Sequence, residues 1–251
     1  MFVRHFATGV PGSAALAEHV LTSGHGTWWT DRPVRPRVVA VTCGGHTLLA
    51  GDPDALTPAD LAPLAGQCVE APAPFLPLLR SAFPLLHTRD RMLYVQQAPP
   101  LPTRPVRGVS VRRLCPEDGS ALAAADSALH RTYATWGGPH ALARSGYGWA
   151  AFRKGRLLAV ASSRFAGSRY EDVACATVTA ERRRHLAAAC VAGLSADVTA
   201  RGRSATWSCS RDDRASRLLA WTSGFRLVSE YTHHTTGPRT AHGSIPLHAA
   251  A

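Results

Sequence analysis

Residues 170–187, Tyr-Glu-Asp-Val-Ala-Cys-Ala-Thr-Val-Thr-Ala-Glu-Arg-Arg-Arg-His-Leu-Ala, decide the fold of this chain. The first half of this stretch is rich in small and β-branched residues, which predicts a buried strand. We expect a helix to begin at about Arg182 and to run to a stop at Gly202. A helix start has unpaired N–H groups and a partial positive charge, so it attracts anions. Three arginines there indicate a phosphate or pyrophosphate ligand.

Three shorter elements are predicted after this helix. Residues 203–209 read as a strand, and residues 212–222 read as a short helix that ends before Gly224. Residues 225–232 alternate between apolar and polar positions, as a strand with one buried face does.

The central stretch resembles the signature of the GNAT superfamily of acyl-CoA N-acyltransferases. That signature is Gln/Arg-x-x-Gly-x-Gly/Ala, placed after a strand that splays from its neighbour. Arg182, Leu186 and Ala187 fit it, whereas His185 stands where the first glycine belongs. A side chain at that place would crowd the pyrophosphate, because glycine is used where backbone approaches a ligand closely.

The later elements are similar to a narrower branch of this family that includes the zwittermicin-resistance acetyltransferase. The features in question are Trp207, Ser216, Ala220 and the Gly224-Phe225 turn. In that branch alanine often replaces a tyrosine four residues before the glycine, and Ala220 occupies that place. Ala220 has no proton to donate. Tyr170 and Tyr231 are candidate proton donors by residue type only.

The resemblance implies an α/β (α+β) protein with a GNAT domain at residues 108–237 and a tail at residues 238–251. The elements of that domain are expected in the order β-α-α-β-β-β-α-β-α-β, with a mixed sheet between helices. Residues 98–107 are rich in proline and predict a stiff linker.

A smaller α+β domain is expected at residues 1–97. A hairpin is predicted around Gly44-Gly45, and a helix is predicted to start after Thr57, with Pro58 at its first position. Residues 75–86 suggest another helix, and residues 92–95 a strand. This half either covers one side of an acceptor pocket or is a degenerate copy of the GNAT fold.

The resemblance also assigns coenzyme contacts. The backbone at the end of the splayed strand would hold the pantetheine arm, the following turn would hold the pyrophosphate, and two residues of the closing helix would lie nearby. For those two residues, Asp213 and Ser216, helix capping and polarity of the helix surface explain the residue types better than coenzyme contact does. The predicted coenzyme contacts are Thr177, Val178, Thr179, Arg182, Arg183, Arg184, His185, Leu186, Ala187, Asp213 and Ser216.

Two adjacent carboxylates are the candidate catalytic groups. Acyl transfer requires a neutral amine, and a carboxylate can accept the proton that an alkylammonium group must lose. Glu171 lies where several GNAT relatives have a general base, and the narrower branch tends to be acidic at the place of Asp172. Successive strand residues point to opposite faces, so only one of the two is expected to face the cleft. Both facing solvent at a strand start is the alternative.

The formal net charge is +11, and Lys154 is the one lysine among 28 basic residues. A composition rich in alanine and arginine is actinomycete-like, and the basic surface favours anionic partners such as coenzyme A. The six cysteines are scattered without C-x-x-C pairs, and no signal peptide or spanning segment is recognisable, so a cytoplasmic protein with free thiols is expected. The twelve histidines do not form a zinc spacing, so no metal is predicted.

We therefore expect acetyl-CoA, or another acyl-CoA, as co-substrate and the amine of a small molecule as acceptor. The narrower branch and the actinomycete-like composition suggest a role in natural-product tailoring or self-resistance. Nucleic acid and membrane are not expected as partners, and the sequence leaves homodimerisation open. Two alternatives remain: a catalytically degenerate GNAT module that binds a ligand or serves as a scaffold, and a GNAT-fold enzyme with other acyl-CoA chemistry, such as O-acylation or decarboxylation.

Overall fold

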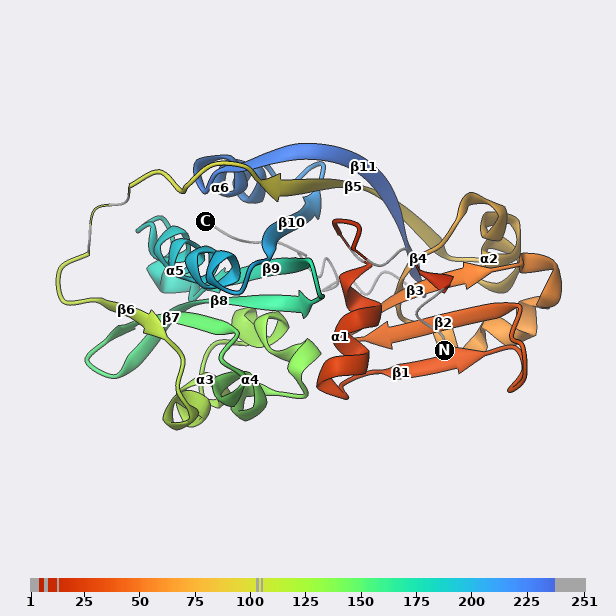
Figure 1. The fold of residues 1–251 in the computed structure, drawn as a ribbon, viewed down its shortest axis with the longest axis horizontal. Helices are drawn as coiled ribbons and strands as arrows, with labels where there is room; N and C mark the ends of the chain where they lie inside the picture. The colour runs from red at the N-terminus through yellow and green to blue at the C-terminus, as the bar shows by residue number, and fades with distance from the viewer. Residues whose placement is uncertain (1–4, 7–8, 13, 103, 105, 238–251) are drawn as a thin grey trace.

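The computed structural model describes residues 5–6, 9–12, 14–102, 104 and 106–237, and its described strands form one mixed sheet (Figure 1). The sheet has 11 strands in the order β1-β2-β3-β4-β11-β5-β10-β9-β8-β7-β6. The strands are β1 Thr27–Thr30, β2 Val38–Cys43, β3 His46–Gly51, β4 Cys68–Glu70, β5 Leu86–Gln96, β6 Ser110–Arg113, β7 Gly148–Arg153, β8 Arg156–Ala166, β9 Tyr170–Thr177, β10 Ser204–Ser210 and β11 Phe225–Thr236.

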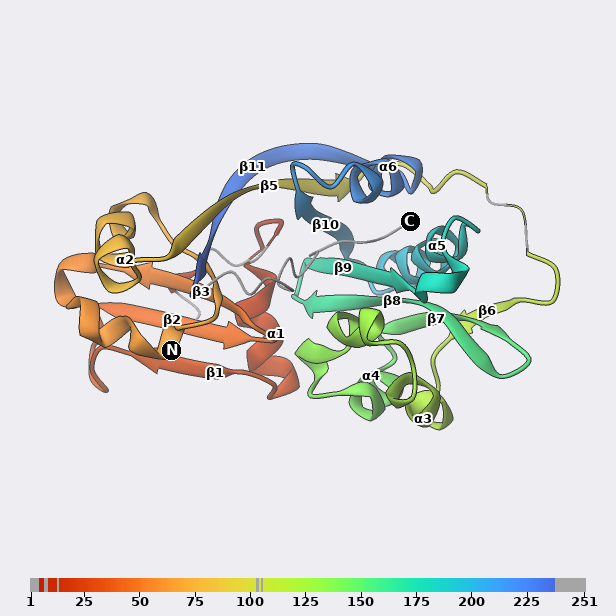
Figure 2. The ribbon, with the colours of Figure 1, turned by 180° about the vertical axis from the view of Figure 1, so that it is seen from behind.

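Helices lie on both faces of this sheet (Figure 2). The α-helices are α1 Ala15–Ser23, α2 Leu76–Ala82, α3 Gly119–Ala123, α4 Pro139–Ser145, α5 Leu186–Ala200 and α6 Arg214–Thr222. Short 3-10 turns join them: η2 Pro53–Ala55, η3 Pro58–Leu64, η4 Ala73–Phe75, η5 Pro116–Asp118, η6 Ser127–Thr132, η7 Ala134–Trp136 and η8 Thr179–Glu181. The predicted order of elements in the C-terminal part, from β6 to β11, is confirmed.

The two halves of the chain share the sheet through β5. This strand precedes the linker in sequence, yet it pairs antiparallel with both β10 and β11. Figure 1 shows β5 and β11 running side by side from the C-terminal half to the N-terminal half. The predicted domain boundary between residues 97 and 98 thus comes directly after β5, a strand that pairs with two strands of the C-terminal half.

Three predicted helices differ from the observed ones. Helix α5 begins at Leu186 and not near Arg182, because Arg183 and His185 have positive φ of 63° and 57°. Three cations in a first helical turn would also oppose the helix dipole. Helix α2 spans part of the predicted 75–86 because Phe83, which precedes Pro84, is extended. The helix expected after Thr57 is the 3-10 turn η3, with Thr57 and Asp60 forming a capping box.

The predicted linker is anchored where it leaves β5. The N–H groups of Gln97 and Ala98 donate to the Gly224 carbonyl, at 3.0 and 3.2 Å, and Leu101 N–H donates to the Thr222 carbonyl at 2.9 Å. A Cβ on Gly224, whose φ is 86°, would lie 1.9 Å from the Ala98 carbonyl oxygen. Glycine is therefore required at the end of α6. Residues 103, 105 and the predicted tail at 238–251 lie outside the described residues.

Buried apolar clusters hold the layers together. One packs α5 and α6 on the centre of the sheet, and a second packs α3, α4 and η6 on the opposite face of β7–β9. A third joins the halves, because Phe165 of β8 packs with Leu16 and Val20 of α1. The fourth lies within the N-terminal half, between β2–β4 and α2.

Candidate functional site

The sheet opens between β9 and β10. These strands pair in parallel from Tyr170/Ser204 to Val173/Trp207, and the pairing ends there. Beyond this point β9 stays paired with β8, and β10 stays paired with β5. The carboxyl-end half of β9 thus has a backbone edge without a strand partner, and buried backbone groups require hydrogen-bond partners. An extended ligand that enters the opening can supply them.

A turn and the start of α5 lie directly beyond this opening. Backbone of Arg183 and His185 in the left-handed region bends the chain sharply before the helix. His185 is the N-cap residue, and its side chain makes no cap hydrogen bond. The first N–H groups of a helix have no acceptor within the helix, so they point outward from the start of α5 as anion donors.

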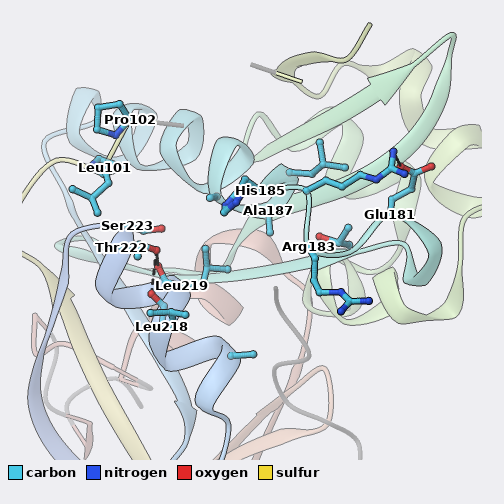
Figure 3. A pocket seen from close by; sticks show the side chains of 16 residues that line it. Leu101, Pro102, Glu181, Arg183, His185, Ala187, Leu218, Leu219, Thr222 and Ser223 are labelled. Carbon is cyan, nitrogen blue, oxygen red and sulfur yellow. Dashed lines mark hydrogen bonds and ion pairs between the residues drawn. The ribbon is translucent and has the colours of Figure 1, made fainter. Parts of the chain in front are cut away.

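A cavity of about 430 Å³ lies between this turn and α6 (Figure 3). Apolar side chains such as Leu186, Leu218 and Leu219 line its interior, and Arg183 and His185 come from the turn. Its full lining is Pro100, Leu101, Pro102, Thr177, Glu181, Arg183, Arg184, His185, Leu186, Ala187, Ala188, Ala215, Leu218, Leu219, Thr222 and Ser223. Such a pocket fits a ligand with a long apolar arm and an anionic group at the helix start.

Six of the predicted coenzyme contacts lie in this cavity wall. They come from the end of β9 and from the turn into α5: Thr177, Arg183, Arg184, His185, Leu186 and Ala187. The Thr177 hydroxyl is buried and has no hydrogen-bond partner in the structure, so it remains available to a ligand.

The other five predicted contacts lie elsewhere. Val178 N–H donates to the Leu158 carbonyl at 2.8 Å, and Thr179 N–H donates to Asp126 at 3.3 Å, so both of these N–H groups already have acceptors. The Arg182 side chain is half-buried, and its Nε atom is buried without a partner.

Asp213 and Ser216 have structural partners. The Asp213 carboxylate caps α6 by accepting from Ser216 N–H at 2.9 Å. The Ser216 hydroxyl accepts from Trp207 Nε1 at 3.0 Å. Burial raises the pKa of Asp213. Capping by Asp213, as favoured from the sequence, is thus observed, whereas surface polarity is wrong for Ser216, which is fully buried. Contact of either residue with the coenzyme remains a prediction.

Glu171 is fully buried in an ion-pair network. Its carboxylate accepts two hydrogen bonds from Arg201, at 2.8 and 2.7 Å, and one from Arg203 at 3.1 Å. The Ser163 hydroxyl donates to it as well. Its acceptor positions are occupied by donors from β8 and from the segment after α5, at the paired end of β9.

Asp172 is also buried, and its partners differ. Arg164 forms an ion pair with it, and the hydroxyls of Thr206 and Ser208 each donate to it at 3.3 Å. Tyr231 lies near this group, and burial raises the pKa of its phenol. The alternative that both carboxylates face solvent at a strand start is wrong, because each is at most 1% exposed.

The histidines and cysteines of the described part of the chain form no recognisable metal site. Within the described residues, no three His, Cys, Asp or Glu side chains are grouped as metal ligands. All six cysteines are free, as expected. The rings of His46 and His233 lie 5.9 Å apart, and His233 contacts Glu70 at 3.3 Å. Over the same part of the chain, no helix has the length and apolar character needed to span a membrane.

Comparisons with known proteins assign this architecture. A protein of Streptomyces virginiae, named as an uncharacterised N-acetyltransferase of the mutA 5′ region, is 53% identical over 199 residues, covering 79% of this chain and 84% of the relative. The family model for GNAT acetyltransferase matches residues 114–234. This chain belongs to the GNAT acetyltransferase family. It is therefore an acyltransferase enzyme, and acetyl-CoA is the co-substrate of its family.

Solved structures share the fold of this GNAT protein at low sequence identity. A GCN5-related N-acetyltransferase-like protein from Streptococcus suis superposes with a TM-score of 0.68, at 16% identity, covering 84% of this chain and 88% of the other. A tandem GNAT protein from the clavulanic acid biosynthesis pathway gives a TM-score of 0.57, at 12% identity, with 93% and 90% covered. The mixed sheet flanked by helices is confirmed.

Several residues of the GNAT cavity were not predicted from the sequence. Pro100–Pro102 form one wall, and the α6 residues Leu218, Leu219 and Thr222 form another (Figure 3). The proline content predicted a linker but gave no sign that this linker lies against α6. Leu101 and Leu218 are 61% and 62% exposed, and apolar side chains at a cavity mouth are suited to contact an organic ligand.

Proposed function

We propose that this GNAT protein acetylates the amine of a small molecule, by direct attack of the amine on the thioester of acetyl-CoA. The observation that carries the proposal is the opening between β9 and β10, which leads into the cavity beside α5. The pantetheine arm enters along the edge of β9, and the pyrophosphate binds at the turn that contains Arg183 and His185. Another acyl-CoA would use the same contacts, because every acyl-CoA has the same pantetheine arm and pyrophosphate.

The reaction requires one bond to form and one to break. The neutral amine nitrogen attacks the thioester carbonyl carbon, the C–N bond forms, and the C–S bond breaks to release the coenzyme thiolate. The ammonium group loses one proton before attack. The attacking nitrogen loses a second proton as the amide forms, and the thiolate takes up one proton, so that the products are the amide and the free thiol of coenzyme A. No covalent enzyme intermediate is needed.

We assign the proton acceptor to Asp172 in preference to Glu171. Two guanidinium groups neutralise Glu171, whereas Asp172 has one guanidinium and two neutral hydroxyl donors. A carboxylate with less cationic compensation accepts a proton more readily. The resemblance to the zwittermicin-like branch, which tends to be acidic at this position, agrees with the assignment.

A role in natural-product tailoring or self-resistance, in the cytoplasm, is the biological setting that we propose. It is supported by the Streptomyces relative and by the actinomycete-like composition. The similarity to a tandem GNAT protein from the clavulanic acid biosynthesis pathway concerns the fold only.

The test combines coenzyme binding with turnover. Calorimetry with acetyl-CoA is expected to give one site per chain with micromolar affinity, and a panel of amines is then assayed for release of free coenzyme A. Ala215→Trp places an indole in the cavity wall and is expected to abolish both signals, while Ala123→Trp, on exposed surface of α3, leaves both unchanged. Absence of binding at millimolar acetyl-CoA would favour a degenerate GNAT module. Binding without acetylation of any amine would favour other acyl-CoA chemistry.

A further inference from the structure

Among the described residues, no acidic side chain forms an ion pair with Arg131. It lies in η6, which is held against β8 by a hydrogen bond of 2.5 Å from the Ser162 hydroxyl to the Thr132 carbonyl. The Arg131 side chain is half-buried, and its Nη1 atom is buried with no hydrogen-bond partner. No ion pair of this residue occurs in the part of the chain that the structure describes. A buried guanidinium N–H without an acceptor is costly, so an acceptor is expected from outside the chain.

Groups of both charges act on this guanidinium. Burial is the main cause that lowers the pKa of Arg131; the charges of Arg164 and Arg182 lower it further, and Cys175 and Asp213 raise it. Arg164 is paired with Asp172. Arg182 follows β9 and has a buried Nε without a partner. Two guanidinium groups beside the opening therefore have unused donors.

The nearby carboxylates are engaged elsewhere. Asp213, whose charge favours the cationic form of Arg131, accepts from Ser216 N–H at the start of α6. Asp126 accepts from Ala128 N–H at 2.9 Å and from Thr179. Neither carboxylate forms a contact ion pair with Arg131.

The position of Arg131 separates it from the coenzyme cavity. None of the residues that line the cavity in Figure 3 comes from η6. Leu129 of η6 packs with Ala176 on one face of β9, whereas Val173 and Cys175 pack toward α5 on the other face. The 3-10 turn η6, which carries Arg131, thus lies on the face of β9 opposite to α5.

We propose that Arg131 binds a carboxylate of the acceptor, so that the substrate is an amine that also carries an acid group. The inference rests on the proposed acetylation of an amine and narrows its substrate class. Bound in this way, the carboxylate occupies the unused guanidinium donors, and the amine of the same molecule can reach the thioester through the opening between β9 and β10. Charge-assisted hydrogen bonds of this kind give both affinity and orientation.

The experiment compares amino acids with their amides, since the amide keeps the shape but removes the negative charge. Because the amide also has a less basic amine, kcat/KM is expressed per concentration of neutral amine. Glycine/glycinamide, phenylalanine/phenylalaninamide and lysine/lysinamide are assayed by release of coenzyme A. We expect wild-type kcat/KM to favour the acid about tenfold or more, because a charged hydrogen bond accounts for at least one factor of ten. Arg131→Gln is expected to reduce that preference to below about threefold, and Arg131→Lys to retain part of it.

The controls separate this site from the coenzyme and from the proposed function. Arg144→Gln, at an exposed arginine of α4, is expected to keep the wild-type preference. Affinity for acetyl-CoA is expected to be the same in all variants. A large loss of that affinity in Arg131→Gln would instead assign Arg131 to a phosphate of the coenzyme and overturn the proposal, as would equal rates for acid and amide in the wild type.

A binding measurement covers the case in which no amine is acetylated. The N-acetylated forms of the same pairs are titrated into protein saturated with coenzyme A. Tighter binding of the acid, lost in Arg131→Gln, supports the carboxylate site although the proposed catalysis has failed for these amines. Equal binding of acid and amide, or binding of neither, overturns the proposal that Arg131 binds a carboxylate.

Discussion

Glu171→Gln offers the sharpest separation of structural and catalytic roles in this protein. The carboxylate is fully buried and compensates two guanidiniums, which belong to Arg201 and Arg203. Removing one partner of a buried ion pair costs about 3–5 kcal/mol. The side chains of Arg201 and Arg203 are 24% and 25% exposed, so water compensates part of the loss. We therefore expect a cost of about 2–4 kcal/mol, which lowers Tm by about 5–15 °C in a chain of this size.

The matched control is Glu230→Gln, because Glu230 forms an exposed ion pair with Arg211 at 3.0 Å. Such surface pairs contribute at most about 1 kcal/mol. Thermal unfolding and the pH dependence of kcat/KM are measured for both variants and for Asp172→Asn. If Glu171 is structural, its variant loses stability but keeps the acidic limb of the profile, which Asp172→Asn removes or shifts. The reasoning would be refuted, and Glu171 restored as the base, if Glu171→Gln were as stable as Glu230→Gln and shifted the acidic limb of the pH dependence of kcat/KM.

Three further predictions concern the coenzyme turn, the acid limit of stability and the thiols. His185→Gly is expected to tighten acetyl-CoA binding in calorimetry and to raise Tm slightly, because glycine adopts positive φ without strain. His185→Ala should tighten binding without the gain in Tm. Unchanged or weaker binding in both variants would show that the imidazole does not crowd the site. Hydrogen bonds from Arg112 lower the pKa of Asp118 to about 2, so this carboxylate stabilises the fold above pH 4 and loses that contribution as the pH falls toward 2. Asp118→Asn should lower the free energy of unfolding by about 1–2 kcal/mol at pH 7, a value discounted for the 45% exposure of Arg112, and should flatten its pH dependence between pH 4 and 2. If chemical denaturation gives parallel pH curves for the variant and the wild type, the assignment is contradicted. Of the six thiols, Cys68 is expected to react fastest with a disulfide reagent in the native protein, because four others are buried with a pKa raised by burial, and hydrogen bonds to Glu117 and Asp118 raise the pKa of Cys115. Fast labelling of any of the four buried thiols would indicate local opening.

The C-terminal elements could be predicted because their signals are local. Small and β-branched residues, turn glycines and the position of Gly224 follow from a few neighbours in sequence, and the order from β6 to β11 was confirmed. The start of α5 was misplaced because the left-handed backbone of Arg183 and His185 has no strong sequence signal. Arginine and histidine adopt that conformation only where the surrounding fold requires it.

Long-range pairings were beyond reach of the sequence. The partners of Glu171 are 30 and 32 residues away, and they meet it because β10 pairs with β9 in the register Ser204–Tyr170. The sequence therefore identified the carboxylate as a candidate base but could not show that two arginines already occupy it. The same holds for Arg131, whose unused donors become visible only once η6 is placed against β9.

The position of β5 bears on what the N-terminal half contributes to the enzyme. Because β5 lies between β10 and β11, the GNAT sheet is incomplete without a strand that precedes the linker. The chain then leaves β5, forms hydrogen bonds with Gly224 and Thr222 at the end of α6, and supplies Leu101 to the cavity beside α5. One continuous segment thus completes the sheet and closes one wall of the cavity. The proposed GNAT domain at residues 108–237 therefore depends on residues 86–102 for its structure, and through them the N-terminal half contributes to the cavity that we propose for the coenzyme.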